Sequence, residues 1–191
     1  MHASSKWLIG LLGVIGLVSL MFIPTGFGYV YPLLLPYQWH KVLHIFGAII
    51  FMGNIIVTGM WMLLAERTKQ AETISFAARA TNWADVLFTA PGIILILFNG
   101  QFLATHWGGV FRTSWITAAL ALFGLSGVVW IAFLIRYQHE LIRLSGSSNG
   151  SVVQLPNAFF LVLHKWYFWG LVATLLPLAS LVLMVTKPKL W

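Results

Sequence analysis

The chain has 191 residues, of which 60% are hydrophobic and only 8% are charged, and its mean hydropathy is +0.89. So little polar surface excludes a soluble globular domain and indicates a protein of the lipid bilayer. The formal net charge is +7, but the basic residues are spread over the ends of apolar runs, which argues against a nucleic-acid partner. The absence of cysteine excludes disulfides, thiolate ligands and covalent haem attachment.

Five apolar runs follow one another along the chain. Each is long enough to cross about 30 Å of hydrocarbon as a helix, which takes roughly 20 residues. The predicted helices cover about 7–23, 40–65, 84–104, 115–135 and 159–185. No ten-residue stretches of alternating polarity appear between turn signals, so strands are not predicted. The sequence therefore predicts an all-α fold in which residues 1–191 form one polytopic membrane bundle of five transmembrane helices.

The basic residues between these runs predict the orientation in the membrane. With a cytoplasmic N-terminus, seven of them face the cytoplasm and four face outward. The seven are Lys6, Arg67, Lys69, Arg79, Arg136, Arg143 and Lys165, and the four are Lys41, Arg112, Lys187 and Lys189. Because cytoplasmic segments are enriched in lysine and arginine, we expect a multi-pass membrane protein with a cytoplasmic N-terminus and an external C-terminus.

The second and third predicted helices each carry a polar stripe. Steps of three and four residues on the second helix join His40, His44, Gly47, Phe51, Asn54 and Thr58. The same spacing on the third helix joins Asp85, Thr89, Gly92, Ile96, Asn99, Leu103 and His106. Polar side chains are costly in lipid, about 2.5 to 3.5 kcal/mol for a central aspartate. We therefore expect the two stripes to face each other inside the bundle.

The histidines near the external ends of these stripes suggest a haem site. Neutral imidazole is a good axial ligand for haem iron, and a helical bundle can hold the flat macrocycle among apolar side chains. We expect His44 to bind the iron of haem b, with His106 or His40 as the second ligand. Lys41 or Arg112 would lie near the propionates. The small residues Gly47 and Ala48 would give the ring room beside the helix.

Other interpretations of the same residues stay open. The i, i+4 pair His40 and His44 also has a metal-chelating spacing that suits copper or zinc. Asn54 and Asn99 are candidate cofactor contacts, with hydrogen bonding between helices as the alternative. Asp85 either handles protons or forms a structural ion pair with Arg67, Arg79 or Arg136. In the plainest interpretation the protein is a non-catalytic membrane scaffold whose histidines are interfacial.

Several motifs, in this order, resemble known membrane families. The stretch Trp39–Ile45 resembles the first helix of the HemJ-type protoporphyrinogen oxidase and of copper-resistance protein D. The segments Thr89–Gly92, Leu134–Leu144, Ala173–Pro177 and Lys187–Pro188 look like later helices of the HemJ type. Residues 54–68, 82–100 and the ending are similar to an uncharacterised bacterial family of predicted integral membrane proteins. The likeness covers about Trp39 to Pro188 and leaves the first helix as an addition to a four-helix core.

The HemJ likeness implies that the dipeptide Leu43–His44 supplies a haem b ligand. HemJ-type proteins also have a histidine-and-lysine patch where this chain has Ser114–Ala119. We therefore expect a b-type haem protein of the bacterial inner (cytoplasmic) membrane to which no catalysis is assigned, and a membrane oxidoreductase stays open. The expected role is electron transfer to or from a quinone or a redox protein. The copper-resistance likeness implies the alternative of a cation bound by His40, His44 and His106. Whether the protein forms a homo-oligomer is left open.

Overall fold

The computed structural model describes residues 3–29, 31–145 and 155–191. The predicted all-α fold is confirmed, since every regular element formed by these residues is a helix. Five helices in the described part of the chain are long and apolar enough to cross a membrane. They cover Trp7–Thr25, Tyr37–Thr68, Ala71–Thr105, Ser114–Ser145 and Asn157–Thr186.

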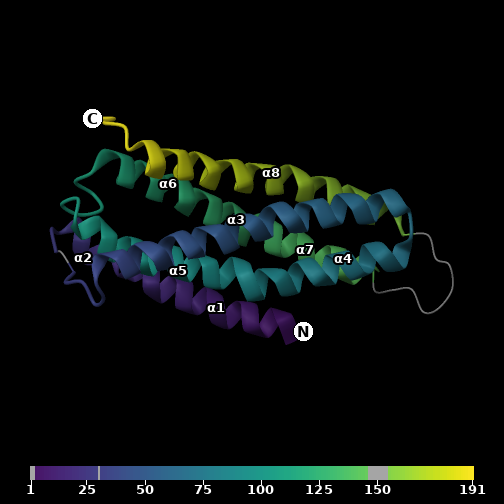
Figure 1. The fold of residues 1–191 in the computed structure, drawn as a ribbon. Helices are drawn as coiled ribbons and strands as arrows, with labels where there is room; N and C mark the ends of the chain where they lie inside the picture. The colour runs from purple at the N-terminus through teal and green to yellow at the C-terminus, as the bar shows by residue number, and fades with distance from the viewer. Residues whose placement is uncertain (1–2, 30, 146–154) are drawn as a thin grey trace.

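The helices run back and forth along one axis (Figure 1). The first three are α1 (Ala3–Leu20), the short α2 (Phe22–Gly26) and α3 (Tyr37–Thr68). The third span joins α4 (Ala71–Ala84), the π-helical segment η1 (Asp85–Thr89) and α5 (Ala90–Thr105). The fourth span joins α6 (Ser114–Val129), the π-helical segment η2 (Trp130–Leu134) and α7 (Ile135–Ser145), and α8 (Asn157–Thr186) completes the bundle. We call the end that holds α2 the α2 end, and the opposite one the α4–α7 end.

The third and fourth spans extend well beyond the apolar runs that predicted them. The third begins at Ala71 and the fourth ends at Ser145, because α4 and α7 continue as amphipathic helices. On α7, Leu141 and Ile142 are buried while Arg143 is exposed. Hydropathy detects the lipid-embedded part of a helix and misses such extensions. As a result, Asp85 lies near the middle of a 35-residue helix and not at its beginning.

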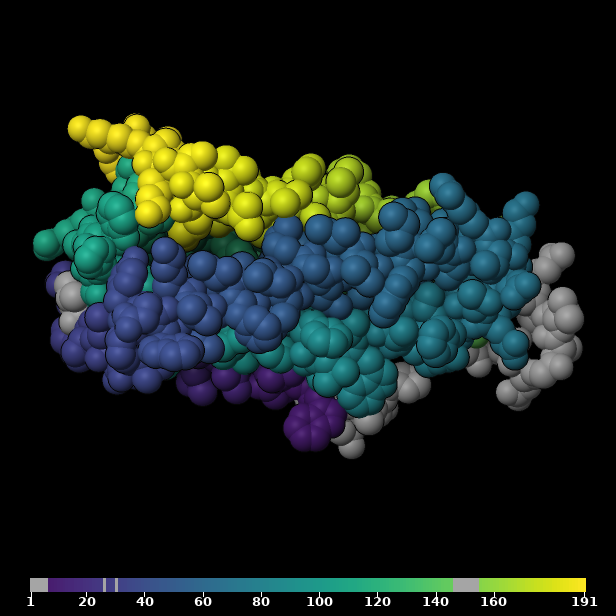
Figure 2. Space-filling model, viewed as in Figure 1, coloured from purple at the N-terminus to yellow at the C-terminus, as the bar shows by residue number. Residues whose placement is uncertain are grey.

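The bundle consists of two closely packed helix pairs. α3 packs along α5, and α6 packs along α8, while α4 and α7 join the pairs at the α4–α7 end. Toward the α2 end, α3 and α8 diverge (Figures 1 and 2). α1 lies against α5 and η1. The pairs are joined at one end and separate at the other, and cavities lined by residues of both pairs lie between them.

Two glycines let the backbones of α3 and α5 come into contact. A Cβ atom on Gly47 would lie 2.7 Å from Cβ of Leu95 and 2.9 Å from the carbonyl oxygen of Gly92. One on Gly92 would lie 2.9 Å from Cβ of Phe51. Small residues at helix crossings are typical of membrane bundles. The expectation that Gly47 leaves room for a bound ring is therefore wrong, since α5 fills the space beside Gly47. Ala48, by contrast, does line a cavity.

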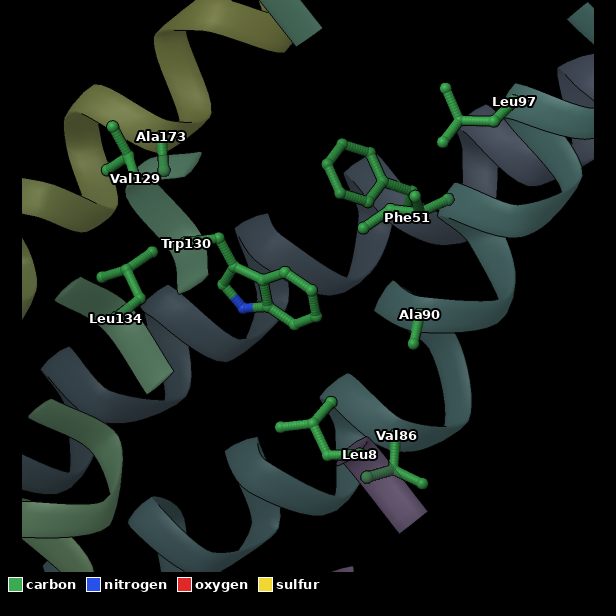
Figure 3. Close-up of a cluster of buried hydrophobic side chains, with 10 residues drawn as sticks. Leu8, Phe51, Val86, Ala90, Leu97, Val129, Trp130, Leu134 and Ala173 are labelled. Atoms are coloured by element: carbon green, nitrogen blue, oxygen red, sulfur yellow. The ribbon is translucent and has the colours of Figure 1, made fainter. Parts of the chain in front are cut away.

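An apolar cluster fills the centre of the bundle. Phe51 of α3 and Trp130 of η2 reach into it from opposite helix pairs, and Leu8 of α1 closes one side (Figure 3). The outer surface is equally apolar: Leu17 and Phe76 are both 68% exposed. A surface covered by large apolar side chains is one that lipid tails solvate.

Candidate functional site

The two polar stripes face each other, as predicted. Nδ2 of Asn54 on α3 donates to Oγ1 of Thr89 on η1 over 2.8 Å. Nearer the α2 end, Nδ1 of His40 and Oδ1 of Asn99 lie 2.8 Å apart. Hydrogen bonds between helices therefore follow the α3–α5 contact along most of its length.

His44 has an arrangement that suits a metal ligand. Its Nδ1 lies 2.9 Å from the carbonyl oxygen of Ile96. Since a carbonyl only accepts, Nδ1 carries the proton of the neutral ring and Nε2 keeps its lone pair. A Cβ on Gly100 would lie 3.0 Å from Cε1 of His44, so the absent side chain at position 100 gives the imidazole its space. The ring is half-buried and contributes to the wall of a cavity.

This His44 cavity has a volume of about 680 Å³ and lies between the two helix pairs, nearer the α2 end. Its wall is mainly apolar and aromatic, with Phe22, Leu103, Trp107, Trp115, Leu120 and Phe123 among the lining residues. Ile49 of α3 and Val185 of α8 line it and are 62% and 73% exposed, so the cavity reaches the lipid-facing surface between these helices. A flat apolar molecule from the bilayer can enter there.

Two lysines belong to this cavity, and one of them was not predicted. Lys41 lines it, as expected of a residue one turn before His44. Lys187 at the end of α8 lines it too, with Nζ 4.6 Å from the ring centroid of Trp107 and 5.8 Å from that of Trp115. The sequence reasoning counted Lys187 among the external basic residues and in the ending that resembles HemJ-type proteins, but gave it no role at the site. Its contact with tryptophans more than 70 residues away depends on the pairing of α8 with α6, which no local pattern reveals.

The other predicted ligands lie apart from His44. His40 is fully buried, its Nδ1 is paired with Asn99, and its Nε2 accepts from the backbone N–H of Leu35 over 3.2 Å. Both of its ring nitrogens are therefore occupied. His106 is exposed at the end of α5, with its ring 5.0 Å from that of Tyr37. Arg112 is exposed in the loop before α6, and neither it nor His106 lines the His44 cavity.

A three-histidine cation site is not formed either. Within residues 3–29, 31–145 and 155–191, no group of three or more histidine, aspartate and glutamate side chains is placed to hold a metal ion. By contrast, Met52 and Met184 both line the His44 cavity. A thioether is a known partner of histidine at haem iron, and the sequence reasoning did not consider these methionines.

Asn54, Asn99 and Asp85 make hydrogen bonds inside the bundle. Asn99 joins His40 to the carbonyl oxygen of Leu95, and neither asparagine lines the His44 cavity. Oδ1 of Asp85 accepts from Oγ1 of Thr89 at 2.8 Å and from Nδ2 of Asn54 at 3.4 Å. Among the described residues the partners of this carboxyl are neutral groups, so the structural ion pair with Arg67, Arg79 or Arg136, one of the two alternatives for Asp85, is not formed.

Comparison with known proteins gives one match. Residues 38–188 match the model of a family described as "Predicted integral membrane protein (DUF2269)". The matched segment covers the four-helix core and leaves α1 outside, which agrees with the extent of the likeness found in the sequence. No curated protein and no solved structure matches the chain. The likeness to HemJ-type proteins and to copper-resistance protein D rests on the sequence motifs alone.

Proposed function

The chain belongs to the DUF2269 family of integral membrane proteins, whose description names no activity, and we propose from its own residues that it binds haem b in the His44 cavity. The observation that carries this proposal is the hydrogen bonding of the His44 imidazole. His44 donates from Nδ1 to the Ile96 carbonyl and keeps the Nε2 lone pair, at the wall of a cavity between the helix pairs.

The contact of His44 with Ile96 is the kind that prepares a histidine for iron. When the ring nitrogen that does not bind the metal donates a hydrogen bond to a carbonyl, the tautomer and the ring orientation are fixed, and the ligating nitrogen becomes more basic. Gly100 adds to this effect by leaving the imidazole in contact with the α5 backbone. In this proposal His44 would ligate the iron, and Met52 or Met184, which line the same cavity, would supply the second ligand.

The rest of the cavity fits the macrocycle. Leucine, phenylalanine and tryptophan side chains supply apolar contact for its faces, and the volume of about 680 Å³ accommodates a molecule of that size. Lys41 and Lys187 supply positive charge for the two propionates, which replaces the expected contribution of Arg112.

Bound haem b supplies one-electron chemistry, and the chain supplies a ligand, an apolar enclosure and access from the bilayer. We propose that the protein exchanges electrons with a quinone or a redox protein. It would do so in the bacterial inner membrane, with its N-terminus in the cytoplasm and its C-terminus outside.

An absorption spectrum tests the proposal. Protein purified in detergent after haem-replete expression should show a Soret band, and His44→Ala should lose it or shift it strongly. His106→Ala is the matched control: it removes an imidazole from the same end of the bundle but not from the cavity, so its spectrum should equal that of the wild type. Wild-type protein without a Soret band would overturn haem binding, and an unchanged spectrum in His44→Ala would overturn the ligand assignment.

A further inference from the structure

A second cavity of about 720 Å³ lies on the other side of Phe51 and Phe123 from His44. These two rings, 5.4 Å apart in an edge-to-face arrangement, line both cavities and stand between them. The second cavity, which we call the Asp85 cavity, is mostly apolar, but six of its lining residues are buried and polar. They are Thr58, Thr81, Asp85, Thr89, Ser126 and Gln138.

Both π-helical segments found within the described residues contribute to this cavity. η1 provides Asp85 and Thr89, and η2 provides Trp130, Ile131 and Leu134. Both segments interrupt a long helix near its middle. A π-helical turn carries one extra residue and disturbs the regular backbone pairing, and such turns are frequent at functional sites. Here two of them, on different helix pairs, meet at one cavity.

The polar groups of the Asp85 cavity are incompletely paired. Oδ1 of Asp85 accepts from Thr89 and from Asn54. Gln138 and Trp130 also direct donor groups toward this carboxyl. Even so, Nε2 of Gln138 has no hydrogen-bond partner among the described residues, although this side chain is only 2% exposed. The same holds for Oγ1 of Thr81. Buried polar groups are normally satisfied, so these atoms point to a bound molecule that pairs with them.

The donor and acceptor atoms of this cavity favour a ligand with a hydroxyl group. A hydroxyl can donate to a carboxylate and accept from an amide N–H at the same time, and Asp85 and Gln138 offer both on one wall. Trp130 and Phe123 provide aromatic faces for an attached ring. Leu63 of α3 and Leu171 of α8 line the cavity and are 45% and 60% exposed, so it reaches the lipid between these helices. An apolar tail can extend through that opening into the bilayer.

We propose that the Asp85 cavity binds a bilayer-soluble hydroquinone whose ring hydroxyl donates to the Asp85 carboxyl and accepts from Gln138. The site is built by residues outside the His44 cavity, so hydroquinone binding does not require bound haem. Failure of one proposal therefore leaves the other standing.

The test measures binding of a tritium-labelled benzohydroquinone with a decyl tail to the full-length protein in lipid nanodiscs, with the counts of empty nanodiscs subtracted. The comparison ligand is the dimethyl ether of the same molecule, which has the same ring and tail but no hydroxyl hydrogen. Wild-type protein should bind the hydroquinone saturably and about tenfold or more tightly than the ether, since a hydrogen bond to a charged group is lost in the ether. Asp85→Asn should weaken hydroquinone binding and leave ether binding nearly unchanged, because only the hydroquinone donates to the carboxyl. Gln138→Leu should also weaken hydroquinone binding.

Equal affinity for the hydroquinone and its ether would mean that the cavity takes up apolar molecules without recognising a hydroxyl, and would overturn the proposal. So would the absence of saturable binding. Gln138→Leu removes a buried donor that has no partner, and such a change is compatible with folding. The ligand comparison on wild-type protein decides the question even if Asp85→Asn does not fold. A wild-type Soret band in the same preparation reports on the His44 cavity separately.

Discussion

His40 and His44 lie one turn apart on α3, yet their hydrogen bonds give them different roles. His40 has partners at both ring nitrogens, from Asn99 and Leu35, and therefore joins α3 to α5 and to the preceding loop. His44 has one such partner and keeps a lone pair for another. The sequence predicted both imidazoles on one face of the helix, but the partner of Nδ1 lies 59 positions away for His40 and 52 positions away for His44.

Gly100 provides a test of how closely His44 must be held. In Gly100→Ala the new Cβ would lie 3.0 Å from Cε1 and 3.2 Å from Nδ1 of His44, so the imidazole must move away from α5. We expect a clear loss of haem occupancy, measured as the ratio of haem to protein after purification. Gly124→Ala on α6 is the control, because its Cβ meets nothing within 4 Å. Equal occupancy in the two variants would show that the space at Gly100 is not needed for the ligand.

The lysine at the end of α8 allows a second test at the same scale. Lys187 has a left-handed backbone conformation with φ of 49°, so asparagine is a suitable replacement that adopts it readily. Lys187→Asn should weaken haem affinity by a few-fold, since an exposed charge contact contributes about 0.2 to 1 kcal/mol. Lys189→Asn removes the same charge two residues further on, outside the cavity, and should leave the affinity unchanged. Titration of haem into haem-free protein measures both, and a similar loss in the two variants would indicate a general effect of charge.

At the scale of the helix, the apolar runs predicted that five spans exist but not where the third and fourth end or deviate. The extensions α4 and α7 bury residues such as Ile74 and Leu141 against other helices, so packing and not hydropathy sets their length. η1 and η2 carry no sequence signature that separates them from α-helix. Asp85 was accordingly predicted near a helix end and beside an arginine. Its real position, in mid-helix among neutral donors, follows from those two features.

Added volume at the close contact between α3 and α5 should lower the stability of the protein. In Gly92→Ala the added methyl would lie 2.9 Å from Cβ of Phe51 and 3.0 Å from the Gly47 carbonyl oxygen. Overpacking of this kind costs about 1 to 3 kcal/mol. We expect a lower midpoint of thermal unfolding in detergent than in the wild type. Gly53→Ala, on the open face of α3, meets nothing within 4 Å and should be neutral or slightly stabilising. A Gly92→Ala variant as stable as Gly53→Ala would show that the two helices can separate without cost.

At the scale of the whole molecule, the two cavities lie between two helix pairs that are joined by α4 and α7 at one end and diverge toward the α2 end. α3 with α5 and α6 with α8 are tightly packed, while Phe51 and Phe123 are the contact that divides the space between the pairs. Sequence periodicity could predict that the two stripes of the first pair face each other. It could not predict the space between the pairs, because that depends on how far α3 and α8 diverge.

The distribution of positive charge along this axis makes the orientation testable. Arg67 and Lys69 flank the turn between α3 and α4, whereas Lys187 and Lys189 follow α8 at the opposite end. The chain has no cysteine, so single cysteines can be introduced without a background of other thiols. With a cytoplasmic α4–α7 end, a membrane-impermeant maleimide should label Lys189→Cys in intact cells and should label Gln70→Cys only after lysis.

Both positions are exposed, so a difference in labelling reports the side of the membrane and not burial. Lys189→Cys also removes one positive charge from the external side, which strengthens the charge bias and does not favour inversion. Labelling of Gln70→Cys alone in intact cells would reverse the orientation and put the His44 cavity, with Lys41 and Lys187, on the cytoplasmic side. The haem and hydroquinone sites would then keep their residues but exchange the compartments that they face.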